Sequence, residues 1–545
     1  MITSEAGRIS AMVAAGQWGS ETLHGLLYRH AMERPDHLAV KDQPNRAELT
    51  GDSPVTLSWK QLDRASENLA CELHARGLNA GDTVLIQLPN ICELLVVYYA
   101  VSKLGAIASP VPVQYGSHEL QHISEALQPS MMITLLQFRT DSIADNARQA
   151  LPWLQILAFG RELELDAAIT KNRLSDVNLD ANQVLTICWT SGTTGTPKGV
   201  PRSHNLWLAS GRCTATAGAY VSADILLNPF PMVNMSALGG FVFPAALLGC
   251  SLVLHHPLDP TLFLTQMQEE RVTFTIAPPA LLNQLAKSPE LWHQFQFDEL
   301  RAIGSGSAPL SPAMIRIFGE DFGVEVINIY GSNEGIALFA TAGSAPDPEV
   351  RASMFPRPGD KALINTRVVD AETGLDQRNE GDRGELLVAG ATVFDGYYEH
   401  DNVDVFTADG FFRTGDLVEI CGQEKVFYKI VGRCKDIINR GGMKISPVEL
   451  DLALEQHPGV AEAAACAYPD ERLGEKICAC MVMQDDEMLL TIAELQEYLL
   501  GMGFAKFKLP ERVVEFDNLP RNALGKVQRF LLQDTVSASK DSDIR

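Results

Sequence analysis

Positive charge is scarce in this sequence: 44 lysine and arginine residues stand against 68 aspartate and glutamate residues, a formal net charge of −24. Such an acidic chain repels phosphate backbones and anionic lipid headgroups, which argues against nucleic acid or a membrane surface as its main partner. Any anionic ligand must therefore be bound by a local group of donors, against the field of the whole chain.

Cysteine motifs and a secretory start are also missing. The ten cysteines show no Cys-x-x-Cys spacing, and residues 1–17 contain no sustained apolar run. We expect reduced, mostly buried thiols in a cytoplasmic protein without a signal peptide. Cys478 and Cys480 lie two residues apart on an expected strand, so they would share one face of it.

Uninterrupted apolar runs of membrane-spanning length are not evident. The longest candidate, residues 235–254, carries no charge but is broken by three glycines and by Pro244. Its length alone would suit a membrane span, but the glycines, the proline and two flanking histidines favour buried core. We therefore expect no membrane span.

The length of 545 residues is too great for one core and indicates at least two domains. Helix and strand signals alternate in the first third and again from 183 to about 340, which predicts largely parallel sheets covered by helices. Shorter, glycine-punctuated strands after Pro356 indicate a small β-rich subdomain. The predicted fold class is α/β: a large N-terminal domain of stacked α/β subdomains, residues 1–434, hinged to a small α+β domain, residues 435–545.

Several helix starts carry capping residues. They are Ser58 with Gln61, Ser446 with Pro447 and Glu449, and Thr491 with Glu494. A serine or threonine followed three residues later by Glu or Gln is typical of a helix N-terminus. The polar, turn-rich segment 42–53 is expected to be an exposed loop.

The most informative segment is Thr190-Ser-Gly-Thr-Thr-Gly-Thr-Pro-Lys-Gly199, which follows an apolar run, 184–189, expected to be a buried strand. Its glycines let backbone N–H groups approach an anion, its hydroxyls donate, and Lys198 supplies positive charge, so the loop suits a polyphosphate. It is not a Walker A loop, because Pro197 precedes the lysine and Gly199 follows it. A P-loop kinase or NTPase is therefore disfavoured.

Four further polar segments follow in chain order. They are Tyr-Gly-Ser-Asn-Glu-Gly at 330–335, Phe-Arg-Thr-Gly-Asp at 412–416, Gly-Arg-Cys-Lys-Asp at 432–436 and Asn-Ala-Leu-Gly-Lys-Val-Gln-Arg at 522–529. A carboxylate beside glycines at a strand end could hold a Mg²⁺ that bridges phosphates, and an aspartate after a tight turn could accept ribose hydroxyls. Alone, each segment would be an ordinary loop or a solvated face. Together, they favour one nucleotide site.

The order of these five segments resembles that of the acyl-adenylate-forming superfamily, which contains acyl- and aryl-CoA synthetases, nonribosomal peptide synthetase adenylation domains and luciferases. The resemblance spans about Thr22 to Phe530. It is greatest to stand-alone bacterial acyl-CoA synthetases, with siderophore-type aryl-acid adenylating enzymes next, and further support comes from residues 440–449, 470–475 and 506–510. It implies a two-step reaction: a carboxylate attacks the α-phosphate of ATP to give acyl-AMP and pyrophosphate, and a thiol then displaces AMP.

The resemblance also implies roles for the matching residues. Lys526 would bridge the carboxylate and the α-phosphate, Glu334 would bind Mg²⁺, and Lys435 would lie at a hinge between the domains. The ATP and AMP site would comprise Thr190, Ser191, Gly192, Thr193, Thr194, Gly195, Lys198, Ser307, Ala308, Tyr330, Gly331, Ser332, Asn333, Asp416, Ile430 and Arg433. The acid pocket would be lined by Asn234, Gly239, Gly240, Gly304, Gly306 and Gly335, and a thiol tunnel would open near Gly442.

Two residues depart from the superfamily pattern. Asn333 stands where a threonine is usual, and Asn234 stands where many members have a histidine before the acid pocket. Asn234 would either contact a polar substituent or accompany a plain acid. His204, after the phosphate loop, is at least as compatible with a packed structural histidine as with a ligand-binding one.

The substrate is only partly constrained. No aspartate lies between Asp224 and Asp259, so nothing there would pair with the α-ammonium group of an amino acid. We expect an aliphatic or aromatic acid without an amino group. The thiol, CoA or an acyl or aryl carrier protein, stays open. A regulatory protein that has lost catalysis is disfavoured because Lys526, Glu334 and Asp416 are all present.

Overall fold

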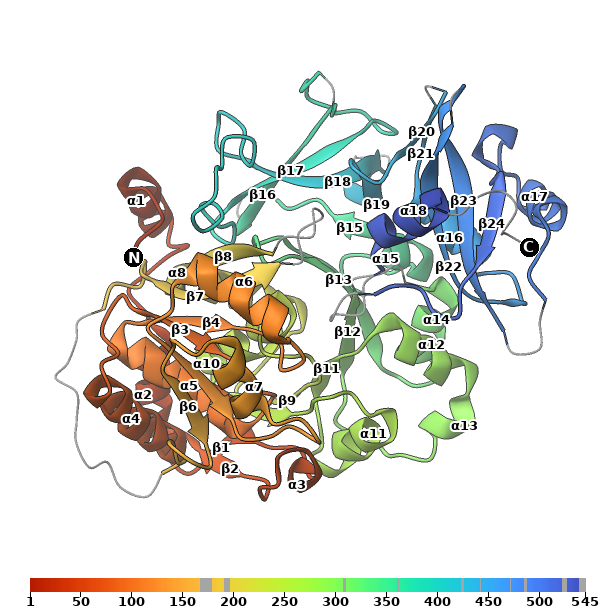
Figure 1. Ribbon diagram of the computed structural model, residues 1–545. Helices are drawn as coiled ribbons and strands as arrows, with labels where there is room; N and C mark the ends of the chain where they lie inside the picture. The colour runs from red at the N-terminus through yellow and green to blue at the C-terminus, as the bar shows by residue number, and fades with distance from the viewer. Residues whose placement is uncertain are drawn as a thin grey trace. The chain divides into compact units, whose positions relative to one another are not determined.

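The computed structural model describes residues 1–166, 179–190, 197–306, 310–359, 362–371, 373–422, 426–441, 443–470, 472–484, 488–521 and 527–538 (Figure 1). The chain forms two compact units. The large unit comprises Met1–Asn365 and Ala389–Gly410, and the small unit comprises Thr366–Val388 and Phe411–Arg545. The mixed α/β class that the sequence predicts is confirmed. The domain boundary between residues 434 and 435 stays a prediction.

One sheet of the large unit has six strands in the order β6-β5-β3-β4-β7-β8. Their bounds are β3 Thr83–Ile86, β4 Ile107–Pro110, β5 Met131–Leu135, β6 Ile156–Phe159, β7 Val184–Thr190 and β8 Lys198–Ser203. The first five strands in this order pair in parallel, and β8 runs antiparallel to β7. Parallel strands buried on both faces read as continuous apolar runs, which is why the sequence revealed β7.

The other sheet of the large unit has eight strands in the order β14-β13-β12-β11-β9-β10-β1-β2. Their bounds are β1 Leu38–Lys41, β2 Thr56–Ser58, β9 Ile225–Asn228, β10 Ser251–Leu254, β11 Phe274–Ile276, β12 Ala302–Gly306, β13 Glu325–Gly331 and β14 Ala337–Ala340. The interior pairings are parallel, and both edge strands, β2 and β14, are antiparallel to their neighbours.

Helices separate and cover these two sheets. The helices of the large unit are α1 Ala6–Ala14, α2 Leu23–Glu33, α3 Arg46–Thr50, α4 Trp59–Ala75, α5 Cys92–Leu104, α6 Ser117–Leu127, α7 Ile143–Ala150, α8 His204–Ala217, α9 Met235–Ala237, the π-helix η1 Leu238–Val242, α10 Phe243–Leu248, α11 Pro260–Glu269, α12 Pro279–Lys287, α13 Pro289–Trp292, α14 Pro312–Glu320 and α15 Pro348–Ser353. One core joins both sheets through α2, α4, α5, α8 and α10. Separate cores lie under α6 and α7 and under α11, α12 and α14. The large unit therefore stacks five alternating helix and sheet layers.

The apolar segment 235–254 is part of the central core. Its residues form α9, η1, α10 and β10, and Trp207 of α8 stacks on Phe243 with ring centroids 5.2 Å apart. In the part of the chain that the structure describes, no helix is long and apolar enough to cross a membrane.

Most of the local signals in the sequence are confirmed. Ser58 and Gln61 form the predicted reciprocal capping box at the start of α4. Ser446 occupies the N-cap position of α16, but its hydroxyl donates to the carbonyl of Val431 instead of capping the helix.

The prediction of an exposed loop over residues 42–53 is wrong. The segment contains α3, and Arg46 is buried in an ion-pair network with Asp42 and Glu93. Burial alone would lower the pKa of Arg46, but the two carboxylates raise it above its usual value. Burial also raises the pKa of Glu93. The polar composition of the segment suggested an exposed loop. The buried ion pair has no local sequence signal, because Glu93, a partner of Arg46, lies far along the chain.

The small unit contains two sheets. The strands β16 Ile364–Val369, β17 Arg383–Gly390, β18 Phe412–Cys421 and β19 Phe427–Arg433 lie in the order β19-β18-β17-β16. The second sheet joins β20 Ile438–Arg440, β21 Met443–Ile445, β22 Val460–Asp470, β23 Gly474–Met483 and β24 Arg512–Glu515 in the order β21-β20-β23-β22, with β24 paired to β23. Its helices are α16 Pro447–Leu454, α17 Ile492–Gly501, the short 3₁₀ turn η2 Lys506–Lys508 and α18 Arg529–Ala538. Thr491 and Glu494 form the predicted capping box of α17.

Candidate active site

The β7–β8 hairpin holds the two ends of the predicted phosphate loop together. Thr190 pairs directly with Lys198, and the Thr190 hydroxyl donates to the Lys198 carbonyl at 3.4 Å. Both residues are half-buried. The hairpin therefore returns the chain so that the lysine stands beside the first hydroxyl of the loop.

A tyrosine connects this lysine to the predicted metal-binding carboxylate. The Lys198 Nζ lies 4.8 Å from the ring centroid of Tyr397, and the Tyr397 hydroxyl donates to Glu334 Oε1 at 2.9 Å. An ammonium over an aromatic face is attracted by the ring quadrupole. Tyr397 thus contacts a cation with its ring and a carboxylate with its hydroxyl. A polyphosphate with a bound metal ion would need both of these charges. No pattern in the sequence pointed to Tyr397.

The segment that carries Tyr397 is fixed by the N-terminus of the chain. Asp395 accepts a hydrogen bond from Ser4 at 2.6 Å and is paired with Arg8. Arg8 also donates to the carbonyl of Gly390 at 2.9 Å. These contacts hold the tyrosine in place from residues almost four hundred positions away, which no local pattern reveals.

A fully buried guanidinium organises the loop around Glu334. Arg202 of β8 donates to the carbonyl of Asn333 at 2.8 Å and to the carbonyl of Thr392 at 3.0 Å. It also donates to Ser210 of α8 at 2.7 Å. Burial lowers the pKa of Arg202 to about 10. Arg202 therefore clamps the two segments that carry Glu334 and Tyr397, and no pattern in the sequence pointed to it.

Asn333 and Asn234 both have structural partners. The side-chain oxygen of Asn333 accepts from the backbone N–H of Met235 at 2.8 Å, which ties residues 332–335 to the start of α9. The side-chain oxygen of Asn234 caps the same helix by accepting from Ser236 N at 3.1 Å. Both departures from the superfamily pattern therefore meet at one short helix.

Three other residues of the 330–335 segment have distinct surroundings. The Ser332 hydroxyl is buried and has no hydrogen-bond partner among the described residues. The Tyr330 ring lies at the end of β13, 5.7 Å from the ring of Phe355. Gly331, the last residue of β13, pairs with Ala337 of β14. A buried hydroxyl without a partner is the kind of group that a ligand satisfies.

The glycines predicted to line the acid pocket allow close backbone packing. A Cβ at Gly306 would lie 2.0 Å from the carbonyl oxygen of Ile329, and one at Gly335 would lie 2.0 Å from that of Thr392. Gly335 also has φ +114°, a conformation that only glycine adopts readily. Gly304 lies on β12 with Gly306, and Gly239 and Gly240 lie on η1. Single-turn π-helices of this kind are frequent at functional sites.

The histidine after the phosphate loop is structural. His204 is buried at the start of α8, and its Nδ1 accepts from the backbone N–H of Leu23 at 3.1 Å. Burial and the neighbouring His24 lower the pKa of His204 to about 3. The imidazole is therefore neutral and occupied at physiological pH.

A cavity of about 410 Å³ lies on the large unit beside Lys198. It is lined by His122, Ala126, Trp189, Pro197, Lys198, Gly199, Tyr398, Glu399 and His400. Lys198 is the one predicted site residue among these lining residues. The glycines of the predicted acid pocket lie elsewhere, so this cavity is not that pocket.

In the small unit, Asp416 and Arg433 face each other across β18 and β19. The Arg433 Nε donates to Asp416 Oδ1 at 2.8 Å, and the side chain of Asp416 is only 8% exposed. Ile430, half-buried, pairs with Val418 on the same two strands. The guanidinium holds the carboxylate in one orientation, as a group that binds a ribose would require.

Lys435 is exposed in the turn that follows β19. The turn is closed by a hydrogen bond from Asp436 N to Arg433 O at 3.1 Å, and Cys434 N donates to Gly415 O of β18 at 2.8 Å. Several other predicted residues lie outside the described residues: Ser191, Gly192, Thr193, Thr194, Gly195, Ser307, Ala308, Gly442 and Lys526.

Comparison with known proteins places these features in a family. The family described as AMP-binding enzyme matches residues 27–398, and the AMP-binding enzyme C-terminal domain matches residues 449–526. Enterobactin synthase component E of Escherichia coli (strain K12) is 30% identical over 541 residues, with 96% of each chain covered. The medium-chain fatty-acid–CoA ligase of Escherichia coli (strain K12) is 28% identical over 561 residues and covers 100% of this chain and 95% of its own.

A solved structure is also similar to this chain over nearly its whole length. ATP-bound MatB from Rhodopseudomonas palustris matches with a TM-score of 0.79 and 27% sequence identity, over 95% of this chain and 99% of that one.

Proposed function

The chain belongs to the AMP-binding enzyme family and is an adenylate-forming acid ligase that uses ATP, and from this premise we propose that it joins a non-amino carboxylic acid to the thiol of CoA. The observation that carries the acid class is the missing carboxylate: no aspartate lies between Asp224 and Asp259. The hydrogen bond of Asn234 to the start of α9 supports a plain acid, because it occupies the side-chain oxygen.

The large unit supplies the groups that would hold the triphosphate. Lys198 offers a cation, and the predicted loop 190–195 offers hydroxyls and backbone N–H groups to the β- and γ-phosphates. Ser332 has a buried hydroxyl without a partner among the described residues, and Tyr330 would stack on adenine. Two anions, the acid and the nucleotide, must meet in this site, so neutralising their charge is its main task.

Glu334 fits a Mg²⁺ site. One of its oxygens accepts from Tyr397, and a carboxylate has further acceptor capacity for a hard cation. Mg²⁺ commonly uses one or two protein carboxylates and completes its shell with phosphate oxygens and water. When bound, the ion would neutralise charge on the phosphates. Tyr397 and Arg202 would keep the carboxylate aimed at it.

The small unit would complete the reaction. Asp416, oriented by Arg433, would accept the ribose hydroxyls. Lys526 would bridge the attacking carboxylate and the α-phosphate during adenylation. Rotation about Lys435 would then withdraw Lys526 and open a thiol path near Gly442. CoA is the thiol that we propose.

A carrier protein is the second candidate for the thiol. The two relatives above are almost equally similar, and one is named as a component of a synthase whereas the other is named as a CoA ligase. Sequence identities of 30% and 28% do not distinguish CoA from a carrier protein as the source of the thiol. The acid could accordingly be loaded onto an acyl or aryl carrier protein in a biosynthetic assembly.

The test is pyrophosphate release across a panel of aliphatic and aromatic acids, each with and without CoA. We expect release that depends on one acid class, with the matching acyl-CoA identified by mass spectrometry. Acid-dependent acyl-AMP without any acyl-CoA would overturn the CoA assignment and favour the carrier protein. Release only with amino acids would overturn the proposed acid class.

A further inference from the structure

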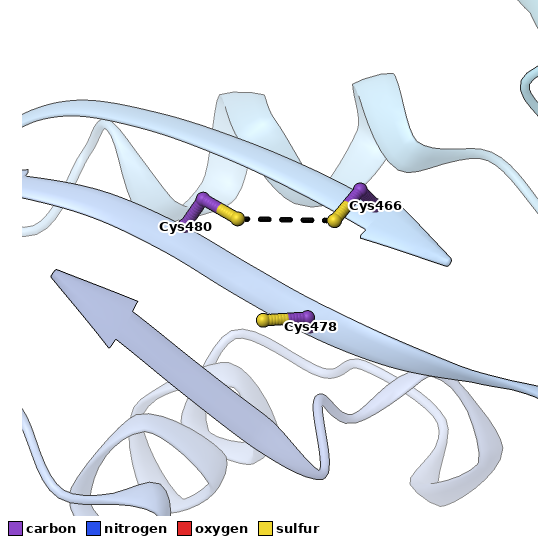
Figure 2. A group of neighbouring side chains, drawn as sticks. All are labelled: Cys466, Cys478 and Cys480. Atoms are coloured by element: carbon purple, nitrogen blue, oxygen red, sulfur yellow. Dashed lines mark hydrogen bonds between the residues drawn. The ribbon is translucent and has the colours of Figure 1, made fainter. Parts of the chain in front are cut away.

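Three cysteines meet in the core of the small unit, and none of them is among the residues assigned a role above. Cys466 lies on β22 directly opposite Cys478 on β23, and Cys480 follows on the same face of β23. Figure 2 shows the Cys480 sulfur turned toward Cys466, at an Sγ–Sγ distance of 3.8 Å. All three sulfur atoms lie within 4.8 Å of one another.

These spacings match a shared metal ion. Zinc-like ions bind cysteine sulfur at about 2.3 Å, so three sulfurs arranged around one ion would be separated by about 4.0 Å. The observed separations need only small rotations of the side chains to reach that value. A pair of antiparallel strands is also a rigid support, because the positions of its side chains are fixed by the ladder.

The surroundings favour a soft ion with few ligands. The three cysteines are at most 1% exposed and pack against Leu519, Leu532 and Val536 in one apolar cluster. Two of these covering residues belong to α18, which lies against β22 (Figure 1). Among the described residues, no other histidine, cysteine or acidic side chain joins the three sulfurs. Thiolate ligands without oxygen donors select soft metals.

Two arginines lie beside the cluster, and one of them, Arg529, is also ion-paired with Asp451. Arg529 donates to the carbonyl of Ala465 at 2.8 Å, next to Cys466, and Arg512 donates to Val536 of α18 at 2.9 Å. A buried anionic cluster is costly unless such cations accompany it.

We propose that Cys466, Cys478 and Cys480 form a three-thiolate binding site for a soft, thiophilic metal ion beneath α18. The site takes ions of the Cu(I) and Cd(II) class. Each thiol that becomes a ligand releases its proton to solvent, and no electron is transferred. The apolar side chains of α18 pack on the three cysteines, so an ion bound only by the folded chain also stabilises this part of the small unit. The proposal does not depend on the acid or thiol that the enzyme uses.

The experiment uses the full chain, reduced and kept under nitrogen. Titration of a denatured sample first checks that all ten thiols are reduced. Cd(II) is added in steps, and the ultraviolet charge-transfer band of cadmium thiolate is followed. X-ray absorption of the loaded protein counts the sulfur ligands directly, without any variant. We expect one ion bound, three sulfur ligands and a higher melting temperature.

Matched variants locate the ion. Cys478→Ala should weaken Cd(II) binding by more than about tenfold, since losing even a supporting contact can cost that much. Cys250→Ala, which removes a buried thiol of the large unit, should leave binding unchanged. A chain that binds no Cd(II), that shows fewer than three sulfur ligands, or that binds equally well as Cys478→Ala would overturn the proposal.

Discussion

At the scale of the residue, the distinctive feature is the phenol of Tyr397 between Lys198 and Glu334. Its ring contacts the cation and its hydroxyl orients the carboxylate, so one side chain sets the distance between the two charges. The sequence pointed to both charged residues through their motifs. It did not point to the tyrosine, because a single aromatic residue in a loop carries no pattern.

Tyr397→Phe separates the two contacts, because phenylalanine keeps the ring and loses the hydroxyl. A hydrogen bond to a charged group contributes about 1.5–3 kcal/mol, so we expect acid-dependent pyrophosphate release to fall roughly tenfold or more at low Mg²⁺ and to recover partly at high Mg²⁺. Initial rates at varied Mg²⁺ and fixed ATP measure this. Tyr28→Phe, at an exposed tyrosine, is the control. Equal Mg²⁺ dependence in Tyr397→Phe and the parent would contradict this role.

His204 gives stability a defined pH dependence. Burial lowers its pKa in the folded chain from 6.5 to about 3, so below about pH 6.5 the unfolded chain binds the proton and the folded chain does not. Stability should therefore fall as the pH falls, by about 2 kcal/mol between about pH 7 and pH 5 from this residue alone.

His204→Gln tests that contribution, since glutamine can still accept from Leu23 N and does not titrate. Urea unfolding at several pH values should show a shallower acid loss in His204→Gln than in the parent. His37→Gln, at an exposed histidine, should keep the parental slope. A parental slope in His204→Gln would show that the acid loss arises elsewhere.

At the scale of the element, β8 does more than close the phosphate-loop hairpin. Its Arg202 lies over the ring of Trp207 at 4.5 Å and donates to carbonyls of two loops and to α8. Local signals predicted the capping boxes of α4 and α17 because propensity acts within a few residues. They did not predict the burial of Arg46 or Arg202, because their partners are distant in the chain.

Arg202→Met keeps most of the side-chain volume and removes the donors. Several buried acceptors would lose their partner together, so we expect the free energy of unfolding to fall by at least about 3 kcal/mol. Denaturant unfolding measures this. Arg316→Met, which removes an exposed and weakly paired arginine, should cost no more than about 1 kcal/mol. If Arg202→Met lowered the free energy of unfolding by less than about 1 kcal/mol, as expected for the control, the clamp would be dispensable.

At the scale of the whole molecule, the proposed residues divide between the two units. The large unit carries Lys198, Glu334 and the predicted acid pocket, and the small unit carries Asp416, Arg433 and Lys435. The division into two units and the α/β class followed from length and from the alternation of helix and strand signals. No local pattern in the sequence predicts how the units move. The proposed movement is tested by measuring the two half-reactions separately.

Lys526→Ala separates the two half-reactions. We expect acyl-AMP formation to fall by two to four orders of magnitude, about the contribution of one positioned charge in a transition state, while CoA attack on added acyl-AMP is largely retained. Quenched-flow rates for each half-reaction measure this. Lys60→Ala, at an exposed lysine of α4, should leave both rates unchanged. Equal loss of both half-reactions would exclude the proposed role of Lys526.

The most direct test of the central claim is exchange of labelled pyrophosphate into ATP, with the acid present and every thiol absent. Exchange requires a reversible acyl-AMP intermediate, so the account predicts label in ATP that depends on both the acid and Mg²⁺. Formation of ADP and phosphate, or exchange that proceeds without any acid, would contradict it.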